Sequence, residues 1–169
     1  ANQPMPSAED DPLLALIDAA GADLIYGIYG YDEPAHTGVS VAASQAFYEH
    51  IKSIDPALQV LQVHRSLDEE NSSHLTPEGM EAYLDLVSAH AQWADIVGFD
   101  VYPIGLSRGS VTPYSNGVMV SPEQAVQDYM TWLQTEFPQK QHVMVLQAFN
   151  VLDLYSDEKL ATLDPEVVA

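Results

Sequence analysis

Two adjacent carboxylates, Asp32 and Glu33, follow an apolar run over residues 24–31 (LIYGIYGY) and directly precede Pro34. A carboxyl group in such a position can donate a proton to a substrate or take one from it. Barrels built from alternating strands and helices form their sites where a strand ends and a loop begins, which is the pattern seen here. The alternative interpretation is that these carboxylates cap the following helix. We favour a functional site because the pattern recurs along the chain.

Three further apolar runs of the chain end in polar or aromatic side chains. These runs deliver His64 and Arg65, then Asp100 and Tyr102, and finally Gln147 and Asn150. Asp100 is expected either to act as a second carboxylate or to hydrogen-bond loop amides. His64 is expected either to bind a substrate hydroxyl or to be a satisfied polar residue at the rim. Asp32 is expected to position its neighbours, because adjacent residues at a strand end point to opposite sides.

The charge of the chain restricts its partners. Of 169 residues, 25 are acidic and 5 are lysine or arginine, which gives a formal net charge of −20. Such a surface repels nucleic acid and anionic membranes, so we expect neither as a partner. No apolar run is long enough for a membrane span. The acidity suits an extracellular or periplasmic protein, or a cytoplasm of high salt in which self-repulsion is screened.

Helical and strand patterns alternate with a period of about 30–45 residues, which indicates an α/β fold with a parallel sheet. After a flexible lead-in over residues 1–11, we expect helices over 12–20, 39–54, 76–93 and 121–137, strands over 24–31, 58–63, 95–101 and 141–149, and a last helical turn from 156. Continuous apolar strands of this kind suit a sheet that is covered on both faces.

Four strands are about half of an eight-stranded barrel, which typically needs about 250 residues. The alternatives are a small doubly wound sheet or a partial (β/α)8 barrel over residues 12–169. No glycine-rich phosphate loop follows any strand, which weakens the nucleotide-binding version of the first alternative. Half a barrel leaves open strand edges, so we expect this chain to be a fragment of a longer protein or to associate with another copy or chain.

Three segments in order resemble the TIM-barrel glycoside hydrolases of the β-galactosidase-like superfamily. They are residues 29–34 (YGYDEP), 47–56 (FYEHIKSIDP) and 94–103 (ADIVGFDVYP), and residues 143–149 (VMVLQAF) resemble strand seven of the same barrels. The resemblance covers strands four to seven and implies that Glu33 stands where the family carries its general acid/base. The chain departs from the family at strand seven, where many members place a nucleophilic glutamate and this chain has Gln147. An amide cannot form the glycosyl-enzyme ester of a retaining mechanism.

These features together predict a glycosidase that acts on an oligo- or polysaccharide, with Glu33 and Asp100 as the catalytic residues. The expected substrate-binding residues are Asp32, Tyr31, His64, Tyr102, Gln147 and Asn150. No spacing typical of a metal site occurs, and we expect no metal and no cofactor. The competing hypothesis is a non-catalytic barrel that binds carbohydrate and has lost its second carboxylate.

Overall fold

A computed structural model of the chain describes residues 11–21, 24–67, 72–102 and 110–146. These residues form a four-stranded parallel sheet in the order β1-β2-β3-β4, which confirms the predicted α/β class. The strands are β1 (Gly27–Tyr29), β2 (Gln59–Arg65), β3 (Ile96–Val101) and β4 (Gln141–Leu146). The expected last helical turn from residue 156 and the end of the fourth strand lie outside the described residues.

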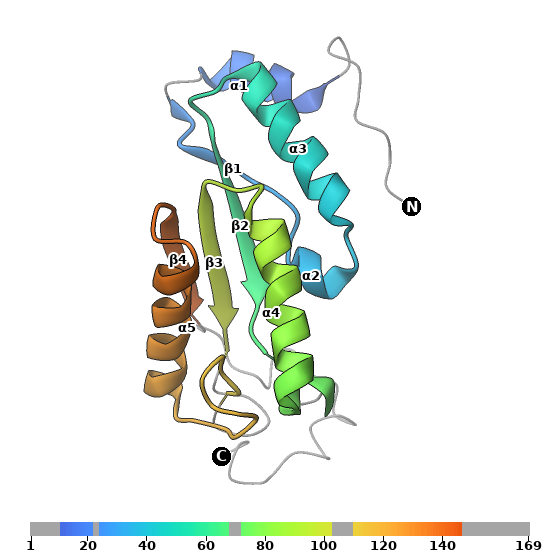
Figure 1. The fold of residues 1–169 in the computed structure, drawn as a ribbon. Helices are drawn as coiled ribbons and strands as arrows, with labels where there is room; N and C mark the ends of the chain where they lie inside the picture. Colours follow the sequence, from blue (N-terminus) through green and yellow to red (C-terminus); the bar gives the residue numbers. More distant parts are fainter. Residues whose placement is uncertain (1–10, 22–23, 68–71, 103–109, 147–169) are drawn as a thin grey trace, which may run out of the picture.

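The main helices are α1 (Pro12–Ala20), α3 (Val41–Ile54), α4 (Pro77–Ala91) and α5 (Pro122–Glu136). Two short helical segments, α2 (Pro34–Thr37) and η2 (Ser72–Leu75), complete the described elements. Figure 1 shows α3, α4 and α5 running alongside the sheet. None of the helices in the described ranges is long and apolar enough to cross a membrane.

The main helices begin where the sequence supplies a capping side chain. Asp11, Ser40, Thr76 and Ser121 each accept a hydrogen bond from a backbone N–H in the first turn of the helix that follows. A proline follows three of these caps, at the helical position where its missing N–H costs nothing. Asp11 therefore belongs to α1 rather than to a loose lead-in.

Helices cover one face of the sheet and build two apolar clusters there. In the larger cluster, Phe99 of β3 lies against Tyr129 and Trp132 of α5, with ring centroids 4.6 and 5.6 Å apart. In the smaller cluster, Val60 of β2 packs with Ile51 of α3 and with residues of α1. We call this side of the sheet the helix face.

Strand register places the remaining side chains on the other side, which we call the open face. In a parallel sheet, residues paired across neighbouring strands point the same way. Arg65 pairs with Asp100, which pairs with Val145, whereas His64 pairs with Phe99 on the helix face. Asp100 and His64 therefore lie on opposite faces of the same two strands.

Candidate functional site

The turn after β1 presents Glu33 in an unusual backbone conformation. Glu33 has φ 44° and ψ 53°, in the left-handed region that few residues other than glycine adopt. It precedes α2, yet its side chain makes no capping hydrogen bond, so the capping alternative does not account for it. Its backbone N–H donates to the carbonyl oxygen of Val63 at 3.1 Å, which ties the turn to β2. Non-glycine residues held in this region concentrate at functional sites.

Asp100 lies near the carboxyl end of β3 and is almost fully buried, with 7% of its surface exposed. Burial, a hydrogen bond with Glu33 and the negative charges of Glu33 and Asp32 raise the pKa of the Asp100 carboxyl to about 8. Its Oδ1 has no hydrogen-bond partner among the described residues. Glu33 and Asp100 thus interact at this edge of the sheet.

Two tyrosines at the ends of β1 and β3 belong to the same electrostatic cluster. The Tyr29 hydroxyl donates a hydrogen bond to Asp32. Burial, followed by that hydrogen bond and the charges of Asp32, Asp100 and Glu33, raises the pKa of Tyr29. Burial and the charges of Asp100, Glu33 and Asp32 likewise raise the pKa of Tyr102. Both tyrosines remain about half exposed, so their rings are open to a ligand.

We call these five residues (Tyr29, Asp32, Glu33, Asp100 and Tyr102) the carboxyl cluster. It lies at the carboxyl ends of parallel strands, where open α/β sheets bind their ligands. Two carboxyl groups in contact cannot both ionise readily, so the Glu33–Asp100 pair retains one proton to a higher pH than an isolated carboxyl would. The cluster can therefore supply a proton near neutral pH. Across the described ranges, no group of three or more histidine, cysteine or acidic residues could hold a metal ion.

The prediction that His64 lies at the rim is wrong. Strand β2 continues through His64 to Arg65, and alternation turns the imidazole onto the helix face, where its exposure is 0%. His64 cannot reach a substrate at the carboxyl cluster from there. The Tyr31 ring packs against Phe47 of α3 at 5.7 Å between centroids. Gln147 and Asn150 fall outside the described residues.

The sequence interpretation placed Tyr29 near Glu33 and Arg65 at a strand end but named neither as a site residue. Arg65 pairs with Asp100 across the strands, and its guanidinium donates to Nε2 of His36 at 2.7 Å. Strand alternation was the signal for Arg65, because it turns His64 and Arg65 to opposite faces. Tyr29 precedes Asp32 by three residues across a turn, and the sequence carries no pattern that predicts their contact.

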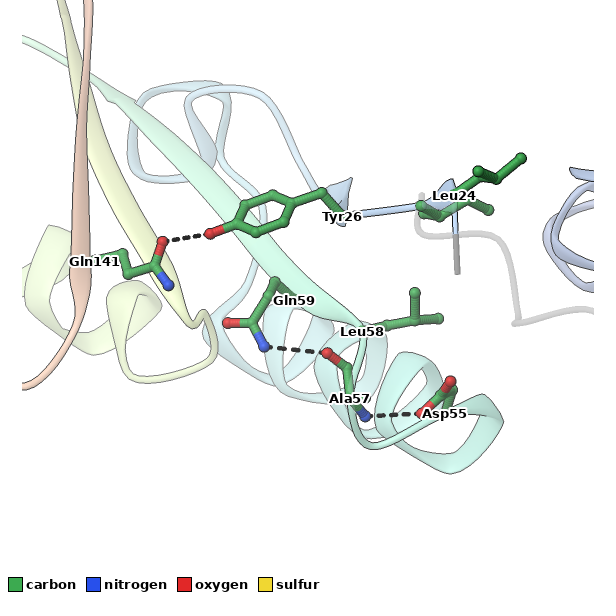
Figure 2. A pocket seen from close by; sticks show the side chains of 8 residues that line it. Leu24, Tyr26, Asp55, Ala57, Leu58, Gln59 and Gln141 are labelled. Carbon is green, nitrogen blue, oxygen red and sulfur yellow. Dashed lines mark hydrogen bonds between the residues drawn. The ribbon is translucent and has the colours of Figure 1, made fainter. Parts of the chain in front are cut away.

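Two hollows lie at the opposite, amino-terminal edge of the sheet. Figure 2 shows the pocket of about 510 Å³ in which the Tyr26 hydroxyl donates to Oε1 of Gln141 at 2.6 Å. A second pocket of about 620 Å³ extends along the open face to Leu61 and Ile96, and Tyr29 of the carboxyl cluster also lines it. Open α/β sheets bind their ligands outside the carboxyl ends of the strands, so we place the candidate site at the carboxyl cluster.

Comparisons of the chain with protein-family models, with curated proteins and with solved structures each find no match. The function is therefore argued from the geometry of the carboxyl cluster.

Proposed function

We propose that this chain is part of a (β/α)8 barrel with glycoside hydrolase activity on oligo- or polysaccharides, and that Glu33 is its general acid/base. The observation that carries the proposal is the contact between Glu33 and Asp100 at the carboxyl edge of a parallel sheet. Further strands would come from the rest of a longer protein or from another copy of the chain. The order of the strands is consistent with such an arrangement.

Glycoside hydrolysis begins with a proton delivered to the leaving oxygen. Glu33 is less buried than Asp100, so Glu33 is the member of the pair that can touch a substrate. Asp100 keeps the pair protonated at a pH at which a solvated carboxyl would have lost its proton. In this scheme Glu33 protonates the glycosidic oxygen, and Asp100 positions Glu33 and shares its proton.

Asp100 is the partner carboxyl of Glu33 in this proposal. Carboxyl groups that flank a glycosidic bond lie about 5–5.5 Å apart in retaining enzymes and about 6.5–9.5 Å apart in inverting ones. The hydrogen bond between Glu33 and Asp100 favours a positioning role for Asp100 in this scheme, with the nucleophile or base supplied by another group.

The second candidate function is carbohydrate binding without catalysis. Gln147, which stands where the resemblance would place a nucleophilic glutamate, favours it. The half-exposed rings of Tyr29 and Tyr102 at the same edge also favour it, since an aromatic ring can pack against the apolar face of a sugar. Both functions use the same edge of the sheet and differ in whether Glu33 transfers a proton.

Replacing Glu33 by glutamine separates the two functions. We expect E33Q to lower kcat/KM for release of reducing ends from an oligosaccharide panel by about 10²–10⁴-fold, because general acid catalysis is lost. E81Q, which changes an exposed glutamate of α4, serves as the matched control and keeps wild-type activity. If E33Q hydrolysed the oligosaccharides at the wild-type rate, the role of Glu33 as general acid would be refuted. Oligosaccharide binding without hydrolysis by the wild type would instead support the second function.

A further inference from the structure

The helix face of the sheet contains a buried polar group that the carboxyl cluster does not use. Ser44 of α3, Gln62 and His64 of β2, and His90 of α4 are each 0% exposed. The His64 and His90 rings face each other with centroids 6.4 Å apart. The Ser44 hydroxyl lies 2.8 Å from Nδ1 of His90, so this group joins α3, α4 and β2.

Most polar atoms of this group have no partner in the described structure. Both ring nitrogens of His64, Nε2 of His90 and both amide atoms of Gln62 make no hydrogen bond. Each such atom costs free energy relative to its hydrated state, whereas apolar side chains of similar size would pack there at no such cost. Two imidazoles at this position therefore lower the stability of the core, which points to a role other than packing.

Among the described residues, none of those named next to His64 compensates a positive charge on its ring. Phe99 of β3 lies 6.1 Å away between ring centroids, and α3 contributes the neutral hydroxyl of Ser44. The titratable group that acts on His64 is His90, which repels a second proton. Arg65, the next residue of β2, lies on the open face and bonds His36. Burial, with the charge of His90, lowers the pKa of His64 to about 3, and burial also lowers the pKa of His90.

We propose that His64 and His90 form an acid-sensitive contact, in which protonation of either ring releases α3 and α4 from strand β2. In the folded protein both rings are neutral, and the helices pack tightly against the sheet. In the unfolded or loosened state the rings are hydrated and bind protons with the ordinary histidine pKa of about 6.5. Acidification therefore favours the loosened state. This inference is independent of the proposed glycosidase activity.

The direct test is an NMR titration of the histidine ring signals in the wild-type chain. We expect the His64 ring to remain neutral down to pH 5, far below the ordinary histidine pKa of about 6.5. Titration of His64 near pH 6.5 in the folded protein would overturn the proposal. This measurement needs no variant and so does not depend on whether a substitution folds.

The second test compares the pH dependence of unfolding in wild type and H64Q by urea denaturation. His64 has a pKa of about 3 in the folded protein and about 6.5 in the unfolded chain. Its protonation in the unfolded chain therefore lowers the folding equilibrium constant about 30-fold between pH 7.5 and pH 5. We therefore expect the wild-type constant divided by the H64Q constant to fall about 30-fold over this range. The ratio removes contributions that both chains share.

S53A is the control, because Ser53 is an exposed residue of α3 whose hydroxyl bonds a carbonyl of its own helix. The substitution removes no titratable group, so its ratio to wild type should stay constant with pH. An H64Q ratio as flat as that of S53A would refute the proposal. A larger loss of helix signal by circular dichroism at pH 5 in wild type than in H64Q would support release of the helices.

Discussion

Two pairs of titratable groups lie on opposite faces of strands β2 and β3, and each pair has at least one buried member. Glu33 and Asp100 meet on the open face, whereas His64 and His90 meet on the helix face. Burial favours the neutral form in both pairs, so it raises the pKa of a carboxyl and lowers that of an imidazole. The same physical cause therefore leaves a proton on the first pair and keeps one off the second.

The two pairs differ in their access to a substrate. The carboxyl cluster includes two half-exposed tyrosines and the exposed Asp32, so its proton can pass to a ligand. The imidazole pair is enclosed by α3, α4 and the sheet, so its protonation is coupled to separation of those elements. A comparable arrangement of groups thus supports chemistry on one face and a conformational response on the other.

The pairs also oppose each other in the pH dependence of stability. The pKa of Asp100 is higher in the folded protein than in the unfolded chain, so the protonated carboxyl stabilises the fold below about pH 4. This stabilisation is lost as the pH rises to about 8. The folded pKa of His64 lies below its unfolded value, so its penalty grows as pH falls from about 6.5 to about 3. Between about pH 4 and 6.5 the two slopes cancel in part.

Replacing Asp100 by asparagine should have the largest effect on the difference in pH dependence between the two pairs. The buried Asp100 carboxyl loses its proton between pH 5 and pH 8.5, which lowers the wild-type free energy of unfolding by about 4 kcal/mol over this range. D100N removes the carboxyl, so we expect this loss to be absent from the variant. Urea denaturation at the two pH values measures this difference. D85N, at an exposed aspartate of α4, is the control and should follow wild type. A D100N profile identical to wild type would mean that Asp100 ionises freely.

Replacing Gly98 by alanine tests how closely the open face is packed beside Asp100. A Cβ at Gly98 would lie 2.3 Å from the carbonyl oxygen of Val143 and 2.4 Å from its Cγ1, so β3 and β4 must separate. We expect a loss of about 2 kcal/mol in the free energy of unfolding. G30A is the matched control, because its Cβ would meet Phe47 at 3.4 Å. Equal stability of G98A and G30A would contradict this packing.

The sequence predicted the alternation of strands and helices better than it predicted the orientation of side chains. Apolar runs and capping residues identify each strand and main helix. Asp100 follows directly from its position near the end of β3. His64 was misplaced because one added strand residue reverses the face to which a side chain points, and strand ends are not encoded sharply. The apolar run before His64 is equally compatible with a strand that ends one or two residues earlier.

The contact between Glu33 and Asp100 could be expected from topology but not from local pattern. Parallel strands bring their carboxyl ends to one edge, which makes proximity plausible. The left-handed conformation of Glu33 and the four-residue helix α2 depend on tertiary contacts, such as the hydrogen bond to Val63. Helix periodicity over four residues is too short to detect, so α2 was missed.

Replacing Ser44 by alanine should have the smallest effect and tests whether the two faces act independently. S44A leaves Nδ1 of His90 without its partner at 2.8 Å, and we expect a loss of about 1 kcal/mol. The exposed Ser53, whose hydroxyl bonds the His50 carbonyl of its own helix, provides the control S53A with little change. Because the sheet separates Ser44 from Asp100, the effects of S44A and D100N should add within about 0.5 kcal/mol in urea denaturation. A larger deviation would show that strand β2 couples the imidazole pair to the carboxyl cluster, so that acid loosening of the helices would also reach the proposed site.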